Sequence, residues 1–126
     1  MKLSSCVIQF VHQYLPHIKG SSRQTIKAYQ DTLAHFIPFA ADTLGVKTAS
    51  LRLEHLTPDL VIAFLDYLET ERKNSARTRN HRLAAIKSLA KMIRFMYPQH
   101  RDMADRILHI PQKRFRKKLI GYLHPN

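Results

Sequence analysis

One run of residues in the second half of the chain has the pattern of a helix that binds a polyanion. Between Ser75 and Tyr97, apolar residues recur at helical spacing, and at 100° per residue a second set gathers on another side of the same helix. That second set contains no acid and consists of Asn80, Ala84, Lys87, Lys91 and Arg94. Lysine and arginine neutralise phosphates, and Asn and Arg side chains can form paired hydrogen bonds with base edges. The pattern therefore predicts nucleic-acid binding.

Other residues are predicted to widen this surface. The start of the same helix offers the hydroxyls of Ser75 and Thr78 beside unpaired backbone amides, an arrangement that suits phosphate oxygens. An earlier helix carries a polar stripe of its own, and two such stripes placed side by side in a bundle would form one positively charged surface. The predicted DNA-contacting residues are Arg23, Lys27, Gln30, Ser75, Arg77, Thr78, Asn80, Lys87, Lys91, Arg94, Lys113 and Arg116.

Net charge is distributed unevenly along the chain. The formal net charge is +12 at pH 7; residues 71–126 hold 15 Lys and Arg against 3 Asp and Glu, whereas residues 1–70 hold 6 basic and 6 acidic residues. Such an asymmetry gives a folded module an electrostatic face that attracts a polyanion by releasing its counterions. The length of 126 residues and the hydrophobic share of 44% indicate one domain with a real core.

The sequence shows no catalytic or metal-binding arrangement. Eight histidines occur, but no two have the i, i+4 spacing of a helical metal site, and the single cysteine, Cys6, has no partner for an internal disulfide. There is no Gly-rich phosphate loop and no cofactor motif. No apolar run approaches the roughly 20 residues that span a bilayer. We therefore expect a soluble, cytoplasmic protein without a cofactor.

Caps, proline positions and apolar spacing predict an all-α fold. The predicted helices run from Ser4 or Ser5 to Pro16, from Ser21 or Ser22 to Gly45, from Thr57 through Leu68, from Ser75 to Tyr97, and over Asp102–Leu108. Pro38 is expected to kink or break the second of these. The short fifth helix leads to an extended basic segment that begins at Pro111. The expected architecture is a bundle of four to five helices with a basic C-terminal linker.

Several motifs occur together in the order and spacing of one known family. The stretch 25–29 (Thr-Ile-Lys-Ala-Tyr) resembles the second helix of the core-binding domain of tyrosine recombinases, the phage-integrase family. Residues 64–68, followed by the run 75–87 with its Ser-x-x-Thr-x-Asn-x-Arg-Leu pattern, are similar to the third and fourth helices of that domain. Residues 118–123 resemble the linker that leads into the catalytic domain. The resemblance covers nearly the whole chain.

This resemblance implies a SAM-like orthogonal bundle that clamps one face of a recombination site, while a separate domain cuts DNA with a tyrosine nucleophile assisted by Arg, Lys, His and a second Arg. The chain contains no His-x-x-Arg, and none of its five tyrosines stands in the nucleophile context. We therefore expect a chain that is not itself an enzyme: a core-binding domain over 1–110 and a linker over 111–126 toward an absent catalytic domain. The implied partners are double-stranded DNA, that catalytic domain and neighbouring recombinase protomers, in the bacterial cytoplasm at the nucleoid.

Each interpretation has an alternative. The basic stripe could be an ordinary solvated face, or it could meet an acidic protein or an anionic membrane, and Phe95 near its edge is the apolar residue that a lipid-facing helix needs. Arg79 and Arg82 project nearer the apolar side, so packing roles compete evenly with DNA contact. The run 113–118 could be a disordered tail with only nonspecific attraction. Basic charge alone does not separate DNA from RNA.

Overall fold

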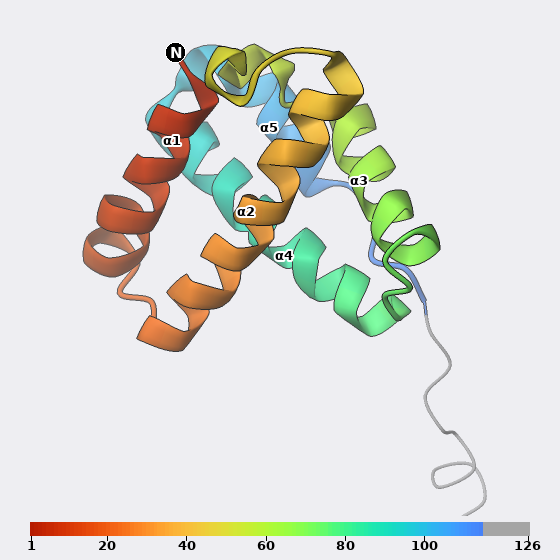
Figure 1. The fold of residues 1–126 in the computed structure, drawn as a ribbon. Helices are drawn as coiled ribbons and strands as arrows, with labels where there is room; N and C mark the ends of the chain where they lie inside the picture. Colours follow the sequence, from red (N-terminus) through yellow and green to blue (C-terminus); the bar gives the residue numbers. More distant parts are fainter. Residues whose placement is uncertain (115–126) are drawn as a thin grey trace, which may run out of the picture.

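The computed structural model describes residues 1–114 and shows a helical bundle (Figure 1). Its main elements are α1 (Leu3–Gln9), η1 (Phe10–Ile18), α2 (Arg23–Leu44), α3 (Pro58–Thr70), α4 (Ala76–Met96) and α5 (Arg101–Leu108). Three single turns connect them: η2 (Thr48–Ser50), η3 (Leu53–His55) and η4 (Pro98–His100). Within residues 1–114 there is no strand, only an isolated bridge between Lys2 and Arg52. The predicted all-α class with four to five helices is confirmed.

Side-chain caps set the starts of the three long helices, as their sequences predict. The Ser22 hydroxyl accepts a hydrogen bond from the Thr25 amide at 3.1 Å, at the start of α2. Thr57 does the same at the start of α3, where its hydroxyl accepts from Leu60 at 3.2 Å. Ser75 caps α4. Each cap satisfies an amide that has no partner inside the helix.

The first helix differs from its prediction at both ends. It begins at Leu3 without a side-chain cap, because the Leu3 amide instead donates to the carbonyl of Leu51 at 3.0 Å. Pro16 does not end it. The chain continues to Ile18 as the wider π-helical turn η1, in which the Lys19 amide reaches back five residues to the Tyr14 carbonyl. A backbone hydrogen bond to the distant residue Leu51 thus takes the place of the expected serine cap. In α2, likewise, the helix runs on through Pro38 to Leu44.

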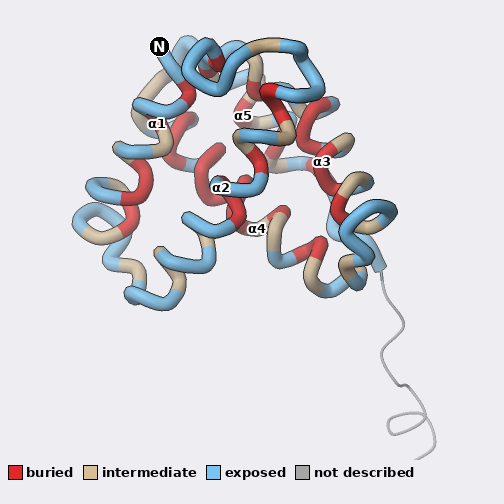
Figure 2. The backbone as a smooth tube through the Cα atoms, viewed as in Figure 1, coloured by how far each residue is buried: buried red, intermediate tan, exposed pale blue. Residues whose placement is uncertain are grey.

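Helix α4 forms the centre of the core. Ten of its residues are buried, compared with five in α2 and five in α3. Figure 2 shows the buried stretches of the other helices turned inward around it. On the α2–α3 side the core is aromatic: Phe36 and Phe64 meet edge to face at 5.2 Å, and Phe39 lies 5.5 Å from Phe64. Such ring pairs add stability beyond the area they bury.

The first nine residues of α2 project from this core. None of residues 23–31 is buried, whereas Thr32, Leu33 and Phe36 in the following turns are. Figure 2 shows the N-terminal end of α2 mostly exposed at the lower edge of the bundle. Because tertiary packing contributes little there, the Ser22 cap has to hold the helix locally. This projecting end makes one wall of the site described below.

Cys6 provides a test of the core. It is fully buried in α1, and burial raises the pKa of its thiol from 9.0 to about 12, because the thiolate is disfavoured away from water. We expect the folded chain at pH 8 to resist a thiol-specific reagent such as DTNB, and to react within minutes once urea exposes the thiol. The free energy of unfolding should also fall as the pH rises above about 9, since only the unfolded chain can then ionise the thiol. Rapid labelling under native conditions would show that Cys6 is accessible.

Candidate nucleic-acid interface

A groove lies between the N-terminal halves of α2 and α4. The two helices cross near the middle of the bundle and diverge toward their N-terminal ends (Figure 1). The groove has a volume of about 420 Å³, and its lining comes only from these two helices: Thr25, Ala28, Tyr29, Thr32, Thr78, His81, Arg82 and Ala84. Small and hydroxyl-bearing side chains dominate this lining, so another molecule can approach both helices closely.

Both helices of the groove begin with the same local motif. Ser22 and Thr25 in α2 match Ser75 and Thr78 in α4: each serine hydroxyl accepts from the threonine amide and donates to the threonine hydroxyl, at 3.0–3.2 Å. The serine oxygen is thus committed to the cap, while each threonine keeps its own hydroxyl hydrogen. Both threonines line the groove. Each helix start therefore presents a hydroxyl donor beside its positive dipole end.

Arg82 joins the two walls. Its guanidinium donates to the Thr32 hydroxyl at 3.0 Å, and that hydroxyl in turn donates to the Ala28 carbonyl at 3.3 Å. Thr32 is 2% exposed, so this contact lies at the buried end of the groove. The alternative of a packing role for Arg82 is therefore the one that the structure supports. This bridge fixes how far α2 and α4 stand apart.

Arg77 shares one side of α4 with His81 and Ala84, which line the groove. They stand at i, i+4 and i+7, so they follow one line along the helix, and Arg77 and His81 are exposed. Arg77 is one of the predicted DNA-contacting residues. His81 is not among the residues predicted to contact DNA, because the histidines were weighed only as metal ligands. Its spacing from Arg77 could have revealed it, since the same helical wheel places both on one side.

The predicted stripe on α2 does not join this groove. Arg23, Lys27 and Gln30 are exposed, but none of them lines the groove, and helical geometry places them on the opposite side of α2 from Thr25 and Thr32. The groove therefore does not bring the two predicted stripes together. A helical wheel describes each helix separately. Which side of α2 faces α4 is decided by the way the two helices cross.

The C-terminal half of the predicted α4 stripe is only partly free. Lys91 is exposed, while Lys87 is half-buried, and that burial together with the nearby Lys91 charge lowers the pKa of Lys87. Arg94 is exposed, but its guanidinium lies 3.2 Å from a carboxylate oxygen of Asp105 in α5. Lys87 and Lys91 therefore repel each other in the absence of an anion. Arg94, in contrast, is already paired with the Asp105 carboxylate.

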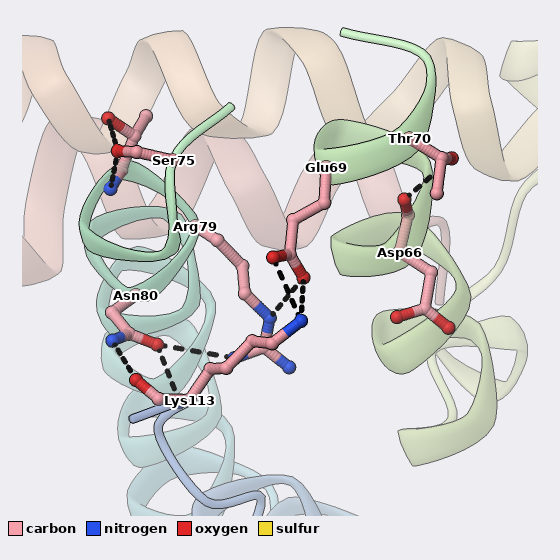
Figure 3. Close-up of polar contacts among 8 residues, drawn as sticks. Asp66, Glu69, Thr70, Ser75, Arg79, Asn80 and Lys113 are labelled. Carbon is pink, nitrogen blue, oxygen red and sulfur yellow. Dashed lines mark hydrogen bonds and ion pairs between the residues drawn. The ribbon is translucent and has the colours of Figure 1, made fainter. Parts of the chain in front are cut away.

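Asn80 and Lys113 have a different role from the one predicted. Asn80 is 7% exposed, and its amide bonds to the backbone of Lys113 at 2.8 Å in both directions (Figure 3). The Lys113 ammonium pairs with Glu69 at 3.0 Å. The prediction that Asn80 is free to read base edges is wrong, because the chain after α5 folds back over it. Arg116, and the run 118–123, lie outside the residues that the structure describes.

Comparison with known proteins agrees with this geometry. The family model "Phage integrase, N-terminal SAM-like domain" matches residues 7–94. The chain belongs to this family. Two relatives from Sinorhizobium fredii are named "Putative integrase/recombinase y4rC", 36% identical over 121 residues, and "Putative integrase/recombinase y4rD", 39% identical over 112 residues. The match covers 96% and 89% of this chain but only 36% and 40% of the relatives' lengths. No solved structure gives a significant match.

Membership of the integrase SAM-like family confirms the resemblance and the SAM-like fold that the sequence predicted. The match includes the groove residues of both α2 and α4, because it extends from residue 7 to residue 94. Within residues 1–114, no three His, Cys, Asp or Glu side chains gather closely enough to hold a metal ion. No helix in that range is long and apolar enough to cross a membrane.

The bridge across the groove of this integrase-family domain can be tested with Thr32→Val. Valine keeps the shape but leaves the Arg82 guanidinium without its acceptor, so we expect the free energy of unfolding in urea to fall by about 1–3 kcal/mol. Thr43→Val is the matched control on an exposed site of the same helix, where a change within about 0.5 kcal/mol is expected. Equal effects of the two substitutions would contradict the bridge.

Proposed function

We propose that this chain binds double-stranded DNA as the core-binding part of a site-specific recombinase, and so positions a recombination site for a catalytic domain. The main support is the α2–α4 groove, whose two walls begin with the same Ser-x-x-Thr cap; His81 lines it, and exposed Arg77 follows on the same side of α4. Family membership supports a role in recombination. Binding itself and the DNA contacts are the proposal.

The geometry of the groove suits a duplex. The N-terminal ends of α2 and α4 diverge, the end of α2 projects beyond the core, and an α-helix fits within the major groove of B-DNA. The Thr25 and Thr78 hydroxyls and the nearby helix amides would bind phosphate oxygens, which sets the orientation. Arg77 and His81 would reach base edges. Ala28 and Ala84 leave room for close approach of the backbone or of a thymine methyl group.

Electrostatics supports the same proposal. Helix α4 contains six Arg and Lys residues and no acid. Two of them, Arg79 and Arg94, have acidic partners among residues 1–114, whereas Arg77, Lys87 and Lys91 have none there. Partial burial and, second, the nearby Lys91 cation lower the pKa of Lys87. A phosphate backbone would relieve that repulsion, with release of its own counterions.

The domain organisation follows from this proposal. We assign residues 1–110 to the DNA-binding domain and residues 111–126 to a linker toward a catalytic domain. The chain spans 36–40% of the length of the two integrase/recombinase relatives. Cleavage and rejoining would then require residues outside the matched region, in agreement with the lack of a His-x-x-Arg motif in the sequence.

The proposal is tested by fluorescence anisotropy with labelled duplex DNA at 50–200 mM salt. Wild-type affinity should fall with salt by ~0.9 log units per log unit for each phosphate neutralised. We expect Arg77→Glu to weaken binding about tenfold or more, because it places a negative charge beside the groove, and Arg77→Ala to cost about 1–3 kcal/mol of binding free energy and to relax the sequence preference. Circular dichroism should show that helical content is unchanged.

Lys47→Glu is the matched control. It makes the same change in net charge at an exposed residue between α2 and η2, away from the groove, and should weaken binding less than threefold. Equal weakening by Arg77→Glu and Lys47→Glu would mean that DNA responds only to net charge. Loss of binding in Arg23→Glu/Lys27→Glu but not in Arg77→Glu would place DNA on the other side of α2.

One observation favours a second candidate function, attachment to an anionic membrane. Phe95 is 67% exposed and Ile18 50% exposed, and both line a hollow together with Lys91 and Arg101. Apolar side chains beside cations are what an interfacial helix requires. Flotation with phosphatidylserine vesicles tests this function. Co-flotation that Phe95→Ser abolishes would support it, and absence of co-flotation while duplex DNA binds would rule it out.

A further inference from the structure

The chain after α5 is held to α4 by a single side chain. The Asn80 amide nitrogen donates to the Lys113 carbonyl at 2.8 Å, and the Lys113 amide donates to the Asn80 side-chain oxygen at 2.8 Å. Figure 3 shows the two bonds side by side. Asn80 is 7% exposed, so water competes poorly for these groups. One asparagine thus satisfies both backbone groups of one residue.

This pairing selects one register. In extended chain the N–H and C=O of a given residue point to the same side, and those of the next residue point to the opposite side. A slip of the segment by one residue would therefore turn both backbone groups away from Asn80. The two bonds would be lost together, and the buried Asn80 amide would have no partner there. The contact thus specifies that Lys113, and no neighbour, lies against α4.

Charged neighbours reinforce the same position. Glu69, near the end of α3, lies 3.0 Å from the Lys113 ammonium and 3.3 Å from the Arg79 guanidinium. The Arg79 contact has the geometry of an ion pair and not of an aligned hydrogen bond. Arg79 also donates to the Asn80 side-chain oxygen at 3.2 Å. The alternative of a packing role for Arg79 is thus the one that the structure supports, and α3, α4 and the C-terminal segment meet at one point.

Burial does not hold this segment. Ile110 is the last buried residue of the chain that the structure describes, and Pro111 to Arg114 are exposed. With no apolar anchor after Ile110, an extended basic segment would be free to change direction. The polar contacts at Lys113 are therefore what determine its path.

We infer that Asn80 is a positioning residue that clamps the chain at Lys113 and so fixes the direction and register in which it leaves the helical domain. The clamp lies on the same turn of α4 as Thr78 and His81 of the groove. A domain attached through this segment would therefore be tethered from a fixed point relative to the groove. This inference goes beyond DNA binding and does not depend on it, because every contact involved lies within the free protein.

Amide hydrogen exchange of the ¹⁵N-labelled full chain, measured by NMR without DNA, tests the clamp. In the wild type, the Lys113 amide should exchange about tenfold or more slowly than that of Gln112, which makes no hydrogen bond with any described residue. Asn80→Ala should abolish this protection. Asn80→Leu, which keeps the buried volume, should also abolish the protection of the Lys113 amide. This variant replaces Asn80→Ala if the alanine variant unfolds.

Two control variants separate the clamp from its surroundings. Lys113→Ala removes the ion pair with Glu69 but leaves the backbone pairing, so protection at residue 113 should change less than threefold. Asn74→Ala removes an asparagine whose only side-chain hydrogen bond among the described residues is exposed, to the Arg72 carbonyl, and should leave protection unchanged. Unprotected Lys113 in the wild type, or equal loss in Lys113→Ala and Asn80→Ala, would overturn the inference.

The direction of the segment can be measured independently. Spin labels on Asp66→Cys and Arg114→Cys report the distance from α3 to the segment, and the buried Cys6 should not react. The wild-type background should give one narrow distance distribution, which Asn80→Leu should broaden at least twofold. A distribution equally broad in both backgrounds would overturn the role of Asn80 in positioning. Because no DNA is present, these results stand apart from the test of DNA binding.

Discussion

The arrangement depends on the burial of α4 among the other helices. Leu83, Ile86, Leu89 and Ile93 are each at most 1% exposed, and they pack into the same core as α1, α2, α3 and α5. Apolar burial of this kind is the dominant favourable term in folding. Because α4 occupies the centre, its position sets the angle at which α2 crosses it, and hence the shape of the groove. In α2 the first nine residues remain outside the core, whereas buried residues of α4 begin at Arg79.

The start of α4 then serves three contacts within six residues. His81 lines the groove with Arg77 on the same side of α4, Arg79 and Asn80 contact α3 and the C-terminal segment, and Arg82 reaches α2. This division follows from the rotation of 100° per residue, which turns neighbouring side chains to different surroundings. A duplex at the groove and a domain beyond Lys113 would both be positioned by the same two turns of helix.

Charge compensation separates structural cations from available ones. Arg79 and Lys113 share Glu69, and Arg94 pairs with Asp105, so these three cations already have acidic partners. Exposed pairs such as Arg94–Asp105 contribute little stability, but they reduce the attraction of that region for an anion. The cations of α4 without an acidic partner among residues 1–114 are Arg77, Arg82, Lys87 and Lys91, so these remain available to an anion.

The amino-acid sequence by itself determined the helices and the family, because Ser22, Thr57 and Ser75 cap through bonds within one turn and apolar spacing is a local pattern. It also indicated Thr78, which lines the groove, since this residue stands at the start of a strongly basic helix. Tertiary structure alone decided that Asn80 meets the Lys113 backbone, which is 33 residues away in sequence. A helical wheel shows which side chains leave the apolar face. It does not show which distant segment covers them, because that depends on how the helices cross and where the chain returns.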